Sequence, residues 1–234
     1  MESHNVCSSD WFVVSGSLSI TQTEKYVQKE GVEMKRICCL KGSPRKKGNT
    51  NTLTKIVTDR LRNEGVGIDE FTLYDMDIKG CLACRWCQKD WTQVRCIQKD
   101  DMQKIYDSIM NSDLLLLSTP IYLWYCTAPM KAALDRTAYA LNMYYGGDIG
   151  PSLWAGKSVA IISSCGYPVE KGADLFEEGV KRLCKHSRLT YRGMLCERHK
   201  NLQLPFMDEE KQEHAEKFAD QILGWLGKKE LDKE

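Results

Sequence analysis

The feature that most constrains the fold is a repeated alternation of short apolar runs with amphipathic segments. Residues 113–119 (DLLLLST) and 158–164 (SVAIISS) are almost continuously apolar, as strands buried on both faces of a parallel sheet usually are. Between such runs, segments such as 101–110 repeat apolar residues every three or four positions, which is typical of one face of a helix. Because each parallel crossover needs a covering helix, the alternation predicts a doubly wound α/β fold.

Five strands and five helices can be placed in this way. The predicted strands are 36–42, 68–75, 113–119, 158–164 and 188–196, and the predicted helices are one starting after Thr50 and those at 101–110, 130–143, 173–185 and 208–225. We expect the flavodoxin-like order 2-1-3-4-5, which places a ligand at the carboxyl ends of strands one and three. We expect one main domain at 34–227, an N-terminal extension at 1–33, a cysteine-rich loop at 80–97 after strand two, and a charged tail at 228–234.

Composition and charge exclude several kinds of partner. The chain has 33 Lys plus Arg against 32 Asp plus Glu, a net charge of +1, and it has no long basic block, so nucleic acid and an anionic membrane are disfavoured. No apolar run approaches the roughly 18 residues that span a bilayer, and we expect a cytoplasmic protein. Eleven cysteines are many for a reducing compartment, where clustered thiols more often bind metal or do redox work.

The loop after the first strand, GSPRKKGNTN (42–51), has the chemistry of phosphate recognition. Ser43 and Thr50 supply hydroxyls, Arg45 a guanidinium and Gly48 a flexible turn, before N–H groups at a helix start. The patterns of nucleoside-triphosphate and dinucleotide loops are missing. The alternative is a Ser-Pro turn followed by a helix cap.

Two further loops leave the same predicted edge of the sheet. After the third strand, aromatic and aliphatic residues stand where polar turn residues are usual, and they suit the faces of a flat ring. The loop SSCGYP (163–168) after the fourth strand adds a glycine and a tyrosine. The alternative is that these aromatics belong to the core or to an interface. The candidate ring-contacting residues are Pro120, Ile121, Tyr122, Leu123, Trp124, Ser164, Gly166 and Tyr167.

The cysteines of the segment GCLACRWCQKDWTQVRC (80–96) are spaced in an unusual way. Cys81, Cys84 and Cys87 are separated by two residues each, and eight residues separate Cys87 from Cys96. Zinc also binds four thiolates, but its sites typically use two separated pairs. A redox pair of Cys81 and Cys84, or thiols with a structural role, are further alternatives.

The remaining cysteines and histidines are given simpler roles. Cys38 and Cys39 in the first strand and Cys184 in a helix should be core residues. Cys126 and Cys165 fall in the ring-contacting loops without a known partner base, and His186 and His199 are expected to be solvated.

The motifs KGSPRKKGNT, GCLACRWCQK, CIQKDDM, DLLLLSTPIYLWYCTAPMKAALDR and SSCGYP, in this order, resemble the flavodoxin-like NADPH-dependent FMN reductase superfamily, and within it the iron-sulfur flavoproteins. The resemblance covers about residues 35–200. It implies FMN, with the isoalloxazine ring against the second and third loops and a [4Fe-4S] cluster on Cys81, Cys84, Cys87 and Cys96. The FMN phosphate would contact Ser43, Arg45, Gly48, Asn49 and Thr50.

The function implied is an FMN-dependent oxidoreductase in which the flavin carries the chemistry and no side-chain acid or base is needed. Electrons would enter through the cluster, with ferredoxin as donor, and leave to oxygen, peroxide, a quinone or a nitro compound. The resemblance also implies a homodimer or homotetramer, with Trp86 and Trp91 as interface candidates. One alternative is an NAD(P)H-dependent FMN, quinone or nitro reductase without a cluster, and another is a flavodoxin-type electron carrier.

Overall fold

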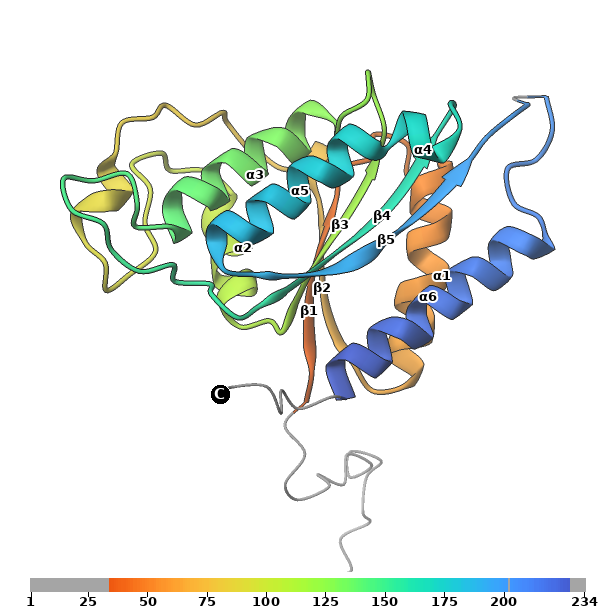
Figure 1. Ribbon diagram of the computed structural model, residues 1–234, viewed down its shortest axis with the longest axis horizontal. Coiled ribbons are helices and arrows are strands. Elements are labelled where there is room, and N and C mark those ends of the chain that lie inside the picture. Colours follow the sequence, from red (N-terminus) through yellow and green to blue (C-terminus); the bar gives the residue numbers. More distant parts are fainter. Residues whose placement is uncertain (1–33, 202, 228–234) are drawn as a thin grey trace, which may run out of the picture. The chain divides into compact units, whose positions relative to one another are not determined.

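The computed structural model describes residues 34–201 and 203–227, and they contain a five-stranded parallel sheet in the order β2-β1-β3-β4-β5 (Figure 1). The strands are β1 (Arg36–Lys41), β2 (Gly67–Thr72), β3 (Leu114–Pro120), β4 (Ser158–Cys165) and β5 (Thr190–Arg198). The predicted flavodoxin-like doubly wound fold and its strand order are confirmed.

Helices cover both faces of this sheet. On one face lie α1 (Asn49–Asn63) and α6 (Glu209–Gly227), which pack against each other. On the other lie α2 (Met102–Met110), α3 (Ala128–Leu141) and α5 (Asp174–Ser187). Short helices are η1 (Leu73–Asp75), η2 (Trp86–Lys89) and α4 (Val169–Gly172).

Most element boundaries differ from the sequence prediction by one to three residues, and two of these differences have clear local reasons. Strand β2 ends at Thr72 rather than at residue 75, and the chain turns through η1, which buries Leu73 in the core. Helix α3 begins two residues earlier than predicted, with Pro129 in its first turn, where its missing N–H costs no hydrogen bond. The four-residue helix α4 was not predicted, because one turn is too short to show an apolar period.

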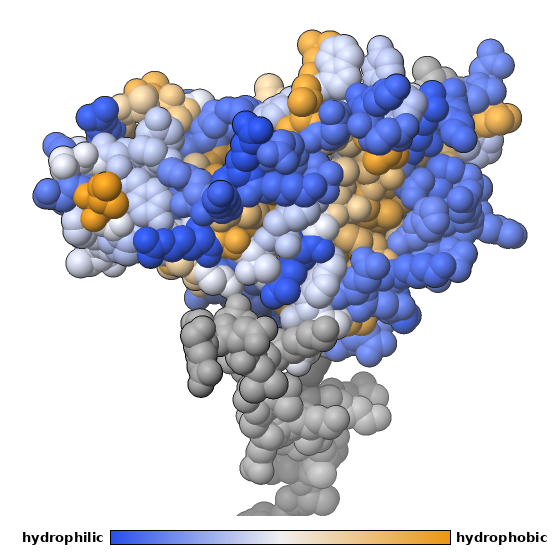
Figure 2. All heavy atoms as spheres, viewed as in Figure 1, coloured by the Kyte–Doolittle hydropathy of each residue, from blue (hydrophilic) through white to orange (hydrophobic). Residues whose placement is uncertain are grey.

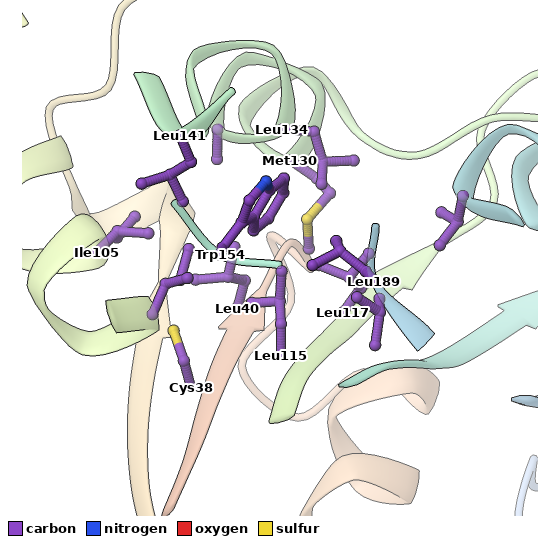
Figure 3. Packing of buried hydrophobic residues seen from close by; sticks show 14 of the residues in the cluster. Cys38, Leu40, Ile105, Leu115, Leu117, Met130, Leu134, Leu141, Trp154 and Leu189 are labelled. Atoms are coloured by element: carbon purple, nitrogen blue, oxygen red, sulfur yellow. The ribbon is translucent and has the colours of Figure 1, made fainter. Parts of the chain in front are cut away.

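The core beside α3 is built around Trp154, which is 1% exposed. Figure 3 shows its ring between Met130 and Leu134 of α3 and strand residues including Leu115. The indole N–H donates to Oδ1 of Asn142 at 2.9 Å, so this buried polar atom is paired. The predicted core cysteines Cys38, Cys39 and Cys184 are buried as well.

The outer surfaces of the helices are mostly hydrophilic, and apolar surface shows between the two helix layers (Figure 2). On the edge strand β2, Glu70 accepts hydrogen bonds from Lys41 at 3.0 Å and from Arg62 at 2.7 Å. None of the helices in the described residues combines the length and hydrophobicity that crossing a bilayer requires. The predicted extension at 1–33 and tail at 228–234 lie outside the described residues.

Candidate functional site

The fold brings the three predicted loops together at the carboxyl edge of the sheet. Gly42 after β1 is held from both sides, since its N–H donates to Ser118 O at 2.7 Å and its carbonyl accepts from Thr127 Oγ1 at 2.8 Å. The start of α1 and the end of β4 are joined by the hydroxyls of Thr50 and Ser164, which are 2.7 Å apart and buried. The candidate residues for phosphate and ring therefore belong to one connected edge.

The loop after β1 carries a hydroxyl, a guanidinium and the free backbone N–H groups at the start of α1. Its residue Gly48 is the N-cap of α1 in an extended conformation, and no side chain caps the first turn of this helix. Ser43 is buried with its hydroxyl 3.3 Å from the backbone N of Arg45, whereas the Arg45 side chain is exposed. Asn51 donates to Arg45 O at 2.8 Å and so fixes the shape of the loop. An uncapped N-terminus, a hydroxyl and an exposed cation suit a phosphate monoester.

Gly48 is required by the tight shape of this loop. A Cβ at this position would lie 2.9 Å from Cβ of Arg45 and 3.1 Å from its carbonyl oxygen, which is closer than real side chains approach. The residue therefore lets the loop close beneath the start of α1, as a phosphate-binding turn needs.

The loop after β3 forms a tight turn that projects apolar side chains. Tyr122 and Tyr125 form an antiparallel bridge, and the two residues between them, Leu123 and Trp124, have positive φ of 48° and 66°. Leu123 is 88% exposed, and Trp124 stacks on Tyr167 of the loop after β4, with ring centroids 5.6 Å apart. Two of the predicted ring-contacting loops thus meet through their aromatic side chains.

The structure corrects the prediction for His199, a residue beside this edge of the sheet. His199 is half-buried rather than solvated, and its Nδ1 lies 3.0 Å from Nδ2 of Asn49 in the phosphate loop. Its Nε2 lies 3.1 Å from Leu204 O. The sequence around His199 is basic and polar, so it gives no indication of this long-range contact.

The four cysteines of the loop at 80–97 line one cavity between this loop and α3. Cys81 and Cys84 are exposed, Cys96 is half-buried and Cys87 is buried with its Sγ 3.2 Å from Tyr139 O. Figure 1 shows this loop in yellow beside α3. Among residues 34–201 and 203–227, no three Cys, His, Asp or Glu side chains converge as ligands of a single metal ion.

The backbone of the cysteine loop turns sharply beside Cys81 and Cys84. Ala83 and Arg85 both have positive φ, of 50° and 56°, and the N–H of Ala83 donates to Sγ of Cys81 at 3.4 Å. Gln88 anchors the loop, since its Nε2 donates to Tyr139 O at 2.7 Å. Backbone N–H groups aimed at sulfur are a recurrent feature of iron-sulfur sites, because they stabilise thiolate charge.

A buried arginine that the sequence analysis missed borders the same cavity. Arg136 of α3 forms an ion pair with Asp100, and both side chains are 1% exposed. Burial opposes the charged form of Arg136, but Asp100 and, more weakly, Cys96 favour it, so its pKa lies above the ordinary value. Its Nε and Nη2 have no hydrogen-bond partner within the described part of the chain. Unpaired donors beside four thiols fit an anionic cluster, which would accept from them.

Comparison with known proteins identifies relatives of this chain. The sequence model of the NADPH-dependent FMN reductase family matches residues 35–175, more than half of the chain. An iron-sulfur flavoprotein of Archaeoglobus fulgidus is 29% identical over 165 residues, which are 63% of this chain and 74% of that protein. An iron-sulfur flavoprotein of Methanocaldococcus jannaschii is 26% identical over 102 residues, 44% of this chain and 51% of that protein. The chain spans about half the length of several of these relatives.

Solved structures support the fold. The NAD(P)H:quinone oxidoreductase from Methanothermobacter marburgensis superposes with a TM-score of 0.63 at 16% identity, covering 86% of this chain and all of that chain (100%). At this identity the likeness shows the architecture alone. The family match, in contrast, covers the loop after β1, the cysteine loop and the loops after β3 and β4. The chain therefore belongs to the NADPH-dependent FMN reductase family, a family of flavin-dependent oxidoreductases.

Proposed function

We propose that this chain binds FMN and passes electrons to a small acceptor, such as oxygen, a peroxide, a quinone or a nitro compound. The observation that carries the proposal is the meeting of three loops at one sheet edge, joined by the contact between Thr50 and Ser164 and by the stack of Trp124 on Tyr167. A phosphate loop beside an aromatic wall matches the two ends of a flavin mononucleotide.

The residues of this edge have distinct tasks in holding the cofactor. Ser43, Arg45 and the first N–H groups of α1 would bind the phosphate, because no side chain in the described part of the chain caps that helix end. Tyr122, Trp124 and their neighbours would cover the ring and exclude water from part of it. FMN, when bound, supplies one- and two-electron redox chemistry, so no side-chain acid or base is required.

We also propose that Cys81, Cys84, Cys87 and Cys96 hold a [4Fe-4S] cluster. Support comes from their shared cavity, from the N–H group that Ala83 directs at Cys81, and from the relatives named iron-sulfur flavoproteins. The exposed positions of Cys81 and Cys84 leave this site accessible to a one-electron donor such as ferredoxin.

The two sites lie at opposite ends of one helix, which bears on the oligomeric state. Thr127, just before α3, contacts the phosphate loop, whereas Tyr139 near the other end of the helix contacts Cys87. At 1.5 Å per residue these two positions are about 18 Å apart along the helix axis. That separation favours electron transfer to the flavin of a second subunit, and hence a homodimer or homotetramer. Trp86 and Trp91, 38% and 40% exposed, are candidate contacts in it.

The composition test decides between the cluster and the other interpretations of the cysteines. The protein would be purified without oxygen, and iron, acid-labile sulfide, zinc and FMN would be measured per chain. We expect about four iron, four sulfide and one FMN, with iron and sulfide lost in Cys96→Ala but kept in Cys184→Ala, whose site is a core position in α5. FMN without iron or sulfide would contradict the cluster, and a chain that binds no FMN would contradict the whole proposal.

A second candidate donor is NAD(P)H, which the description of the matched family favours. Anaerobic bleaching of the visible absorption of the bound flavin would be followed after adding either reduced ferredoxin or NADPH. Bleaching by ferredoxin that Cys96→Ala abolishes supports entry through the cluster. Equal bleaching by NADPH in both proteins supports a hydride-accepting reductase, and reduction without turnover on any acceptor supports an electron carrier.

A further inference from the structure

A second pair of cysteines lies outside the candidate cluster loop. Sγ of Cys165, at the end of β4, is 3.8 Å from Sγ of Cys196 in β5. In the register of these parallel strands Cys196 is opposite Ser163 and Cys165 is opposite Arg198. The two cysteines are therefore diagonal neighbours on one face of the sheet, because side chains two positions apart in a strand share a face.

The surroundings make the two thiols unequal. A hydrogen bond from Cys196 lowers the pKa of the Cys165 thiol, and the positive charge of Arg198 adds to this effect, while burial and the carboxylates of Glu170 and Glu197 oppose it. The same contact and burial raise the pKa of Cys196. Arg198 is held in place, since its Nε donates to Gly166 O at 3.0 Å. Such an arrangement gives one thiol that ionises more easily and one proton-bearing partner beside it, as in dithiol redox centres.

The pair lies at the base of a loop that belongs to the candidate flavin site. Cys165 stands between Ser164 and Gly166, and its Sγ is 3.2 Å from Tyr167 O. Tyr167 is the ring that stacks on Trp124. Bringing the two sulfurs from 3.8 Å to a bonded separation of about 2.05 Å would move the start of this loop toward β5 and remove the contact with Tyr167 O.

We propose that Cys165 and Cys196 are a reversible dithiol–disulfide couple that a peroxide closes and a small dithiol reopens. The Cys165 thiolate attacks one peroxide oxygen, which breaks the O–O bond, forms a sulfenic acid on Cys165 and, with a proton, releases water from hydrogen peroxide. Cys196 then attacks that sulfur, which forms the S–S bond and releases a second water. Overall, two thiols lose two electrons and two protons, and one hydrogen peroxide becomes two waters.

A further consequence rests on the proposed FMN function. Formation of the disulfide would shift residues 164–167. It would disturb the stack of Tyr167 on Trp124 and the contact between Ser164 and Thr50. We therefore expect the closed form to bind FMN about tenfold more weakly than the open form, a difference of about 1.4 kcal/mol. The couple would link the oxidation state of the protein to its cofactor content.

Peptide mapping tests the bond directly. The full chain with its cofactors would be treated with hydrogen peroxide, its free thiols alkylated, and the protein cut with trypsin. We expect residues 158–171, which contain Cys165, to be joined to residues 193–198, which contain Cys196, in a product that dithiothreitol separates. In Cys196→Ala, a dimedone adduct should appear on Cys165 instead, whereas Cys184→Ala should retain the joined product.

Other outcomes would overturn the proposal in separable ways. Alkylation of both cysteines after peroxide has been consumed, or a bond from either one to a different cysteine, would refute the couple. A joined product with unchanged FMN affinity, measured by fluorescence titration, would refute only the link to the cofactor. If neither form binds FMN, the proposed function fails while the peptide result still decides whether the disulfide forms.

Discussion

Replacing Gly42 by alanine should destabilise the protein and weaken its phosphate loop. The added Cβ would lie 2.9 Å from Thr127 Oγ1 and 3.1 Å from Cβ of Met130, and both of these side chains are buried. Overpacking of this kind costs about 1–3 kcal/mol. Moving Thr127 would also break its 2.8 Å hydrogen bond to Gly42 O, at a cost of about 1 kcal/mol. Together we expect about 2–4 kcal/mol of lost stability.

The assay is urea unfolding followed by circular dichroism, on protein with and without FMN. A loss of this size corresponds to a fall in Tm of about 5–15 °C for a chain of this length, and FMN affinity should fall as well. The matched control is Gly224→Ala in α6, where a Cβ meets nothing within 4 Å, so that it should be neutral or stabilise by up to about 1 kcal/mol. A Gly42→Ala protein within about 0.5 kcal/mol of the wild type would refute the packing argument.

Three further substitutions test the structure elsewhere. Asp100→Asn leaves the buried Arg136 without its counter-charge and should lower the free energy of unfolding in urea by about 3–5 kcal/mol. A loss below about 1 kcal/mol would contradict a buried ion pair. For Glu70, burial alone would raise the pKa, but its two basic partners outweigh burial and lower it. This carboxylate therefore stabilises the fold above its unfolded pKa, and that stabilisation is lost as the pH falls through the folded pKa. Glu70→Gln should cost about 0.2–1 kcal/mol of unfolding free energy at pH 7 and progressively less below about pH 4. A cost that does not change with pH would contradict the lowered pKa. Asn142→Ala leaves the indole N–H of Trp154 unpaired and should cost about 1–3 kcal/mol in thermal unfolding. A Tm unchanged within 2 °C, roughly the effect of 1 kcal/mol, would exclude this role.

The sheet and its order could be predicted because each buried strand appears in the sequence as an apolar run. The residues of β4 from Ser158 to Cys165 are all buried, and the run SVAIISS already indicated this. The three loops of the candidate site could be located for the same reason, since in a parallel sheet the order of strands determines which loops share an edge. Which atoms of those loops meet FMN stays a prediction.

Contacts between distant segments could not be predicted from one sequence. Nothing near Arg136 in the chain indicates that it pairs with Asp100, because α3 meets the cysteine loop only in the folded protein. The approach of Cys165 to Cys196 likewise depends on the register between β4 and β5, which includes an irregularity between Val159 and Ala160. A shift of one residue there would place the two sulfurs on opposite faces of the sheet.

The cysteine loop follows the edge strand β2 and has only the single turn η2 as regular structure, whereas the other site loops follow the inner strands β1, β3 and β4. Amide hydrogens of the inner strands should therefore exchange only through global unfolding, and those of the cysteine loop through local opening of much lower free energy. The proposed cluster would then be assembled by opening of this loop alone, without loss of the sheet. Cofactor loading would in this way follow folding rather than direct it.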